Sequence, residues 1–217
     1  MTDTYRHKGL RNKLVQSLRK KGITDERILS VMNQIPRHFF LEKAFEEQAY
    51  KDQAFPIGCE QTISQPYTVA FQTQLLEVKK REKILEIGTG SGYQAAVLAS
   101  LGARVFTIER QEALYKKTKQ LLDDLGFSGI RMYFKDGYLG LPEFAPFDKI
   151  LVTAGAPEVP EKLLKQLKIG GVLVVPVGVK IQRMLRIIRL SEDEFKQEEW
   201  GDFRFVPFLS GIQKRGL

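Results

Sequence analysis

A glycine-rich turn carries the most specific chemical signal in this chain. The apolar run at residues 83–87 leads directly into Gly88-Thr89-Gly90-Ser91-Gly92, and a helical pattern begins near Tyr93. Glycines at such a turn let a ligand approach the backbone, and the N–H groups at the start of the next helix are free to bind it. Tyr93 stands where the dinucleotide fingerprint needs a third glycine, and no Walker lysine follows. The turn therefore predicts a cofactor site of another kind, with Gly88, Gly90 and Gly92 in contact with the ligand.

Two acidic residues narrow the choice of ligand. Glu86 lies two residues before the first glycine, where a carboxylate would repel a pyrophosphate and attract an ammonium group. Glu109 ends the next apolar run, where an acid can accept hydrogen bonds from both hydroxyls of a ribose. A cationic ligand that carries a ribose and no phosphate is S-adenosylmethionine. Taken singly, Glu109 could be a surface acid and the glycines a tight turn, so the prediction rests on their order along the chain.

The surrounding residues predict the fold that positions this turn. From residue 83 onward, short runs rich in Val and Ile alternate with helical patterns, and parallel strands need such crossover connections. The predicted strands are residues 83–87, 103–109, 130–134, 147–153 and 170–177, with helices at 95–101, 113–125 and 161–167. Residues 184–190 and 203–209, separated by an acidic, turn-prone segment, predict an antiparallel C-terminal hairpin. We therefore expect an α/β fold with a Rossmann-like, doubly wound, mostly parallel seven-stranded sheet covered by helices on both faces.

The first third of the chain has a different pattern. Residues 5–78 are largely helical in character, and Asp25 with its neighbours forms an N-terminal signal for a helix that Pro36 ends. A polar, proline-bearing loop, AFPIGCEQTISQPY, precedes a second amphipathic segment at residues 69–78. The sequence thus predicts a helical N-terminal extension, residues 1–78, and an S-adenosylmethionine-binding core, residues 79–217.

Composition and charge exclude several classes of protein. The net charge is +8, and seven basic residues against one acid within residues 1–21 account for most of it. Leu10, Leu14 and Leu18 recur among these charges, so a solvated amphipathic helix is favoured over a site for a polyanion or an acidic partner. The single cysteine, Cys59, excludes a disulfide scaffold and suits a reducing compartment. The longest apolar stretch is about half the ~20 residues that a membrane span needs, and no apolar signal core follows the first basic residues. We therefore expect a cytoplasmic protein without a membrane partner.

Two groups of motifs resemble known enzymes. The segment ILEIGTGSGYQAA is similar to the first motif of class I methyltransferases, and Asp136-Gly137 resembles the acidic turn that contacts adenine there. The loop IGCEQTISQPY, residues 57–67, resembles the signature of protein-L-isoaspartate O-methyltransferases, as do PRHFFLEKAF, AYKDQAFP, FDKILVTAGAP and RFVPFLSG. These matches extend from about residue 36 to residue 211.

The resemblance implies roles for the loop at residues 57–67. In that family the loop supplies part of the cofactor pocket and a serine beside the methyl acceptor, which corresponds to Ser64 here. The neighbours of Ser64 that would bind the cofactor are Gln61, Thr62 and Ile63. One departure is Glu60, where bacterial relatives commonly have a glycine, because glycine permits backbone conformations that glutamate resists. Without the resemblance, Ser64 would be interpreted as a residue that caps a turn.

The implied reaction is methyl transfer to the α-carboxylate of an L-isoaspartyl residue, with possible acceptance of D-aspartate, which starts repair through a succinimide. A carboxylate with a reference pKa near ~4 is already ionised at neutral pH, so the reaction needs no strong base. No catalytic histidine or metal is expected, and packing is the expected role of His38. Ser64 would orient the acceptor by a charge-assisted hydrogen bond. An extended acceptor peptide could pair with backbone groups around Val206.

Two alternatives remain. A nucleic-acid methyltransferase could use the basic first helix, but Thr153-Ala154-Gly155-Ala156-Pro157 lacks the Asn or Asp that orients an amine acceptor. A binding protein that has lost transfer chemistry is the other alternative, and the Cys59-Glu60 departure is its one indication. We therefore expect isoaspartyl proteins and peptides as substrates, no nucleic-acid partner, and a monomer.

Overall fold

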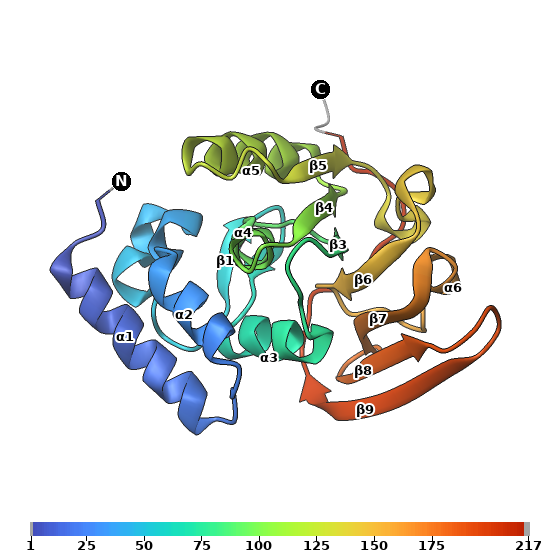
Figure 1. The fold of residues 1–217 in the computed structure, drawn as a ribbon. Helices are drawn as coiled ribbons and strands as arrows, with labels where there is room; N and C mark the ends of the chain where they lie inside the picture. The colour runs from blue at the N-terminus through green and yellow to red at the C-terminus, as the bar shows by residue number, and fades with distance from the viewer. Residues whose placement is uncertain (1, 215–217) are drawn as a thin grey trace.

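The computed structural model describes residues 2–214 and confirms the predicted α/β fold (Figure 1). Its centre is a seven-stranded sheet in the order β5-β4-β3-β6-β7-β8-β9. Strands β3 to β7 run parallel, whereas β8 and β9 are antiparallel to their neighbours. The strands are β3 (Lys83–Ile87), β4 (Arg104–Glu109), β5 (Arg131–Phe134), β6 (Phe147–Val152), β7 (Leu167–Val177), β8 (Gln182–Arg189) and β9 (Phe195–Phe203).

Helices cover both faces of this sheet. One hydrophobic core includes residues of α1 (Tyr5–Lys20), α2 (Glu26–Gln34), α3 (Pro66–Leu76), α4 (Tyr93–Ser100) and α5 (Glu112–Asp124), and the other includes α6 (Glu161–Leu164). Successive strand residues point to opposite faces, so Ile84 belongs to the first core and Leu85 to the second. Helix α6 is shorter than predicted because β7 already begins at Leu167. Among residues 2–214, no helix combines the length and the apolar composition needed to cross a bilayer.

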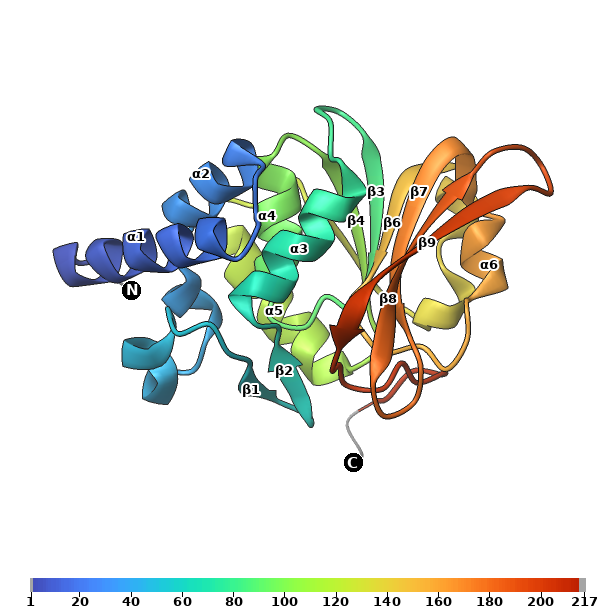
Figure 2. The same cartoon turned by 90° about the horizontal axis from the view of Figure 1, so that it is seen from below.

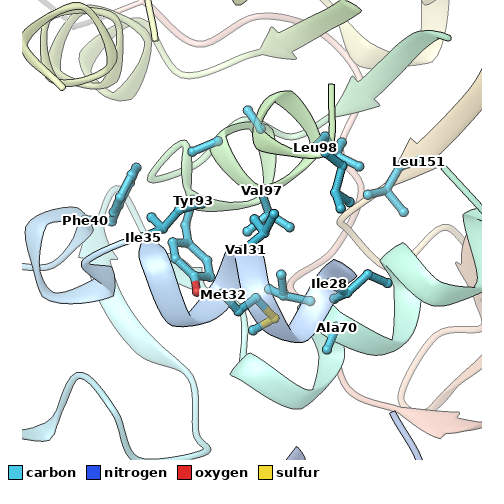
Figure 3. Close-up of a cluster of buried hydrophobic side chains, with 14 of the residues drawn as sticks. Ile28, Val31, Met32, Ile35, Phe40, Ala70, Tyr93, Val97, Leu98 and Leu151 are labelled. Carbon is cyan, nitrogen blue, oxygen red and sulfur yellow. The ribbon is translucent and has the colours of Figure 1, made fainter. Parts of the chain in front are cut away.

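The N-terminal helices pack on the sheet through α4. Helix α2 begins at Glu26, and the carboxylate of its N-cap, Asp25, accepts a hydrogen bond from the Arg27 N–H. Figure 3 shows the apolar side chains at and just after α2 beside those of α3 and α4: Ile28, Val31, Met32, Ile35, Ala70, Val97 and Leu98. Helix α3 also contacts β6 and β7. One continuous core therefore joins residues 1–78 to residues 79–217, and the domain boundary between them stays a prediction.

The C-terminal hairpin differs from the prediction in its second strand. Strand β8 pairs with β9, which lies inside the segment that we expected to be an acidic turn. Its charges suit an edge strand that is mostly exposed, and they pair across the strands, as in the 2.9 Å contact between Arg186 and Glu198. Residues 204–209 are not a strand of the sheet. They form a C-terminal strap, joined to the loop after β6 by a single bridge between Gly155 and Pro207.

The polar loop before α3 is a short hairpin instead of an irregular loop. Strand β1 (Phe55–Gly58) pairs antiparallel with β2 (Gln61–Ile63), and Cys59 and Glu60 form the turn. Both turn residues have positive φ angles, 51° and 56°, the geometry of the tight turn that usually carries Asn-Gly. Glu60 therefore adopts the backbone conformation for which glycine is better suited. Figure 2 shows this hairpin at the same end of the molecule as the end of β9 and the C-terminal strap.

Candidate active site

A cavity lies at the carboxyl ends of β3, β4 and β6, and we call it the glycine-turn cavity. It brings together most of the predicted site residues, from four separate parts of the chain: Gln61, Thr62, Ile63, Ser64, Gly88, Gly90, Glu109 and Gly137. Glu86, Gly92 and Asp136 are absent from its lining. The β1–β2 hairpin, the glycine turn and the C-terminal strap therefore enclose one common space.

The glycine turn allows close approach at two of its three glycines. Gly88 has a φ of 96°, and a Cβ at this position would lie 2.6 Å from the hydroxyl of Thr153. Gly90 also has a positive φ, of 52°. Gly92 serves a different purpose, because a Cβ there would lie 2.8 Å from Thr118 of α5. Gly92 thus permits packing of the turn against α5, and it does not line the cavity.

Glu109 is held at the cavity wall by backbone N–H groups. Its carboxylate accepts hydrogen bonds from Gly90 at 2.9 Å and from Gln111 at 2.8 Å. Only 4% of the residue is exposed, and burial raises the pKa of Glu109 while these bonds lower it. Because a carboxylate oxygen has more than one acceptor site, each oxygen can still accept a hydrogen bond from a ligand hydroxyl.

Glu86 lies behind the cavity wall. The residue is fully buried, and its carboxyl accepts a hydrogen bond of 2.5 Å from the hydroxyl of Thr107. Thr107 in turn lies 2.7 Å from the hydroxyl of Thr89, which does line the cavity. Burial raises the pKa of Glu86 to about 8, so the carboxyl is mostly neutral at pH 7. In the structure, the acid that we expected to face the cofactor is connected to the cavity through two threonines.

Asp136 also acts from outside the cavity. Its carboxylate accepts hydrogen bonds from the N–H of Tyr138 at 2.9 Å and from the N–H of Gly211 at 2.8 Å. It therefore caps the short helix η3 (Gly137–Leu139) and ties this turn to Gly211, two residues after the C-terminal strap. Gly137 lines the cavity, and a Cβ there would lie 2.5 Å from Ile87.

A second cavity meets the first at Ser64. This aromatic groove is lined by residues of α3, β9 and the C-terminal strap, among them Tyr67, Phe71, Trp200, Phe203 and Phe205. The two cavities share four lining residues: Thr62, Ser64, Thr153 and Val206. Ser64 thus stands in a wall common to a cavity built around the glycine turn and a groove built from aromatic side chains.

Arg37, in the short helix η1 (Arg37–Phe40), holds the segment that carries Ser64. The guanidinium is fully buried, and it donates hydrogen bonds to the carbonyl of Ser64 at 2.9 Å and to that of Ala49 at 3.0 Å. Burial lowers the pKa of Arg37 to about 10, so it stays charged at neutral pH. Sequence reasoning gave this residue no role, because its partners are backbone atoms from distant positions that no local pattern reveals.

Backbone groups around Val206 already have hydrogen-bond partners within the protein. The carbonyl of Val206 accepts a hydrogen bond of 2.8 Å from the N–H of Gly155, and the N–H of Phe208 donates to the carbonyl of Gly155 at 2.8 Å. The strap is therefore already paired with the loop after β6 at the point where we expected a peptide to add. It forms part of the wall of both cavities.

Neither histidine lines these cavities. His38 lies against His7 with ring centroids 3.9 Å apart, and its Nδ1 is 2.6 Å from the hydroxyl of Tyr50. This confirms the packing role expected for His38. Asp3, His7 and His38 offer ligand atoms close enough for a metal ion, but Arg11 donates two hydrogen bonds, of 3.1 and 3.0 Å, to the Asp3 carboxylate.

The solved structures share this fold. A structure of a protein-L-isoaspartate O-methyltransferase matches with a TM-score of 0.84 at 31% identity, over 93% of this chain and 67% of its own. A Plasmodium falciparum protein of the same description, in complex with S-adenosyl-L-homocysteine, matches with a TM-score of 0.81 at 24% identity, over 92% of this chain and 98% of its own.

Sequence relatives match over almost the whole chain. Proteins named protein-L-isoaspartate O-methyltransferase from Christiangramia forsetii and Flavobacterium psychrophilum are each 61% identical over 209 residues, covering 96% of this chain and 98% of the relative. A family model described as Protein-L-isoaspartate(D-aspartate) O-methyltransferase (PCMT) matches residues 9–213. Because this match includes the N-terminal helices and the C-terminal strap as well as the cofactor core, the chain belongs to the protein-L-isoaspartate(D-aspartate) O-methyltransferase family.

Proposed function

We propose that this protein transfers a methyl group from S-adenosylmethionine to the α-carboxylate of L-isoaspartyl residues in damaged proteins and peptides. The observation that carries the proposal is the position of Ser64, in the wall shared by the glycine-turn cavity and the aromatic groove. A methyl donor in the first and a polypeptide in the second would meet at this residue.

The residues of the glycine-turn cavity fit the cofactor. Gly88 and Gly90 line the cavity and have no side chain, so neither places one between the backbone of the turn and a ligand. The Glu109 carboxylate, fixed by two backbone N–H groups, is placed to accept hydrogen bonds from ribose hydroxyls. S-adenosylmethionine supplies a methyl group activated by the positive charge of its sulfonium. Gln61, Thr62 and Ile63 complete the wall beside Ser64.

The chemistry of the lining favours a carboxylate as the acceptor. Neither cavity is lined by histidine or lysine among the residues that the structure describes, and the carboxylates in their linings are already engaged, Glu109 by backbone N–H groups and Asp202 by Arg183. An ionised carboxylate needs no proton removed, and its in-line approach to the methyl group supplies most of the rate through proximity. The Ser64 hydroxyl would donate a hydrogen bond to the acceptor carboxylate. The methyl ester formed loses methanol, when a neighbouring backbone nitrogen attacks its carbonyl carbon, more readily than the free acid loses water. The product can therefore close to a succinimide, which water reopens in part as normal aspartate.

The basic N-terminal helix gives little support to a nucleic-acid substrate. Four of the seven basic residues within residues 1–21 have acidic partners within the protein: Arg6 with Glu47, Arg11 with Asp3, Arg19 with Glu26, and Lys21, just after the helix, with Asp52. A helix whose charges are paired internally has fewer of them available for phosphates. We therefore propose that the protein acts as a monomer on isoaspartyl polypeptides and not on nucleic acid. A cytoplasmic location is also proposed, on the basis of the single cysteine.

One assay tests this proposal. The protein is incubated with methyl-labelled S-adenosylmethionine and paired peptides that differ only in a normal or an isoaspartyl linkage, and in parallel with tRNA and duplex DNA. We expect base-labile label on the isoaspartyl peptide alone. Label on nucleic acid would overturn the proposal, and cofactor binding without transfer would instead indicate a binding protein.

A further inference from the structure

Four aromatic side chains form one wall of the aromatic groove, and we call them the aromatic wall: Tyr67, Phe71, Trp200 and Phe203. The rings of Phe71 and Phe203 have centroids 5.3 Å apart, and Phe71 lies 6.4 Å from Trp200 in an edge-to-face arrangement. Tyr67 stacks on Phe71 at 5.6 Å. These distances are typical of rings in contact, so α3 and β9 present a continuous apolar surface to the groove.

Trp200 is unusual in its surroundings. It lies on the edge strand β9, whose other side chains include Lys196, Glu198, Glu199 and Asp202, yet 41% of the tryptophan is exposed. Ile181, which also lines the groove, is 53% exposed. Large apolar side chains grouped at a groove and left in contact with water are typical of a surface that binds another molecule.

We propose that the aromatic wall is a side-chain subsite that binds an apolar residue, aromatic or aliphatic, close to the isoaspartyl residue of the acceptor polypeptide. This inference rests on the proposed function, because it identifies the occupant of the groove as the methyl acceptor. The groove shares Ser64 and Thr62 with the glycine-turn cavity, so a polypeptide whose carboxylate reaches Ser64 continues into the groove. An extended chain advances ~3.3 Å per residue, so the residues nearest the isoaspartyl position are the ones that meet the wall.

Two charges beside the aromatic wall are paired within the protein. Asp202 is engaged by Arg183 at 3.3 Å, and Lys21, 5.9 Å from the Tyr67 ring, is engaged by Asp52. Arg204 also lines the groove, but it belongs to the C-terminal strap and not to the four rings of the wall. A charged neighbour placed there would lose hydration without gaining a partner, whereas an apolar one would remove apolar surface from water.

The first test is a peptide series. In a Gly/Ser-rich host peptide with one isoaspartyl residue, phenylalanine is placed in turn at each of the three positions before and after it, and kcat/KM is measured for each peptide. We expect about a tenfold gain at one or two positions over the host peptide, a range typical of one apolar group in a pocket. Glutamate at the same positions should give no gain. Equal kcat/KM for all peptides would overturn the subsite, whereas no methylation of any isoaspartyl peptide would overturn the proposed function itself.

Variants of β9 locate the subsite. The preference is the ratio of kcat/KM for the phenylalanine peptide to kcat/KM for the host peptide. Trp200→Ala should lower this ratio to about 1, and Trp200→Phe should retain most of it. Phe195→Ala is the matched control, because Phe195 is an aromatic residue of the same strand, 37% exposed, and does not line the groove. It should keep both the preference and the activity on the host peptide. Retention of the full preference by Trp200→Ala would refute the assignment.

Trp200 also supplies a readout that does not depend on turnover or on a variant. It is the only tryptophan of the chain, so the protein's tryptophan emission reports on the wall alone. In the presence of S-adenosylhomocysteine, titration with the preferred phenylalanine peptide should shift this emission to shorter wavelength, because the indole loses contact with water. The host peptide should cause a smaller shift at the same occupancy. An emission spectrum that stays unchanged at saturation with the phenylalanine peptide would refute the contact.

Discussion

The buried carboxyl of Glu86 makes a quantitative prediction about stability and pH. Burial raises its pKa to about 8 in the folded protein, against a reference value of 4.5. Between these two values the folded state keeps a proton that the unfolded state releases. Stability from this group is therefore fully present below pH 4.5 and is lost as the pH rises through about 8.

The substitution Glu86→Gln removes this titration while keeping the shape of a neutral carboxyl. The free energy of unfolding of the variant, minus that of the parent protein, should rise by about 1.4 kcal/mol per pH unit across the interval. From pH 6 to pH 8 the difference should grow by about 2 to 3 kcal/mol, since the slope flattens near the folded pKa. Above that pKa the difference should become constant, with the glutamine variant the more stable protein.

The assay is urea unfolding of both proteins at pH 6, 7, 8 and 9 in constant salt, without cofactor. Thr107→Val is a companion variant, because the Thr107 hydroxyl lowers the pKa of Glu86 and its removal should move the end of the slope to higher pH. A difference between parent and Glu86→Gln that is constant within about 0.5 kcal/mol over this range would refute the reasoning, because a single titrating group obeys the linkage relation.

Three further predictions concern the turn, the cofactor and the acceptor. Glu60→Gly should stabilise the protein by about 0.5–1 kcal/mol in thermal unfolding, because Glu60 has a φ of 56°. The control Glu158→Gly, in an exposed loop without positive φ, should not stabilise it. A lower melting temperature for Glu60→Gly would contradict this prediction. Glu109→Ala should raise the dissociation constant for S-adenosylmethionine about tenfold or more in calorimetry, and an unchanged constant would exclude the ribose contact. Ser64→Ala should lower kcat for an isoaspartyl peptide about tenfold or more while cofactor affinity stays within about twofold, and equal losses in both would exclude an orienting role.

The glycine-turn cavity was largely predictable because its main residues follow consecutive strands. Gly88, Gly90 and Glu109 lie at the carboxyl ends of two neighbouring parallel strands, and these ends lie side by side at one end of the sheet. Glu86 was expected to face the cofactor because it lies close to the turn in sequence. Helices cover both faces of β3, so Glu86 is fully buried there and its carboxyl accepts a hydrogen bond from Thr107 of the neighbouring strand β4.

The aromatic groove was far less predictable, for a different physical reason. Strand β9 carries charges on both faces because it is an edge strand, so it lacks the alternation that marks a half-buried strand, and its sequence resembles a turn. The aromatic groove then depends on contacts between residues more than a hundred positions apart, such as Phe71 with Trp200. No local pattern encodes such a pair.

The glycine-turn cavity and the aromatic groove differ in how freely their residues can be substituted. The glycine turn is constrained by its neighbours, because a Cβ added at Gly88 would lie 2.6 Å from the Thr153 hydroxyl and would displace it. Trp200 is 41% exposed on an edge strand, where a change of side chain disturbs few buried atoms. A substitution at Trp200 should therefore change which damaged sites are preferred while the cofactor cavity keeps its shape. We therefore expect selectivity for the acceptor and binding of the cofactor to be separable by substitution, even though both cavities meet at Ser64.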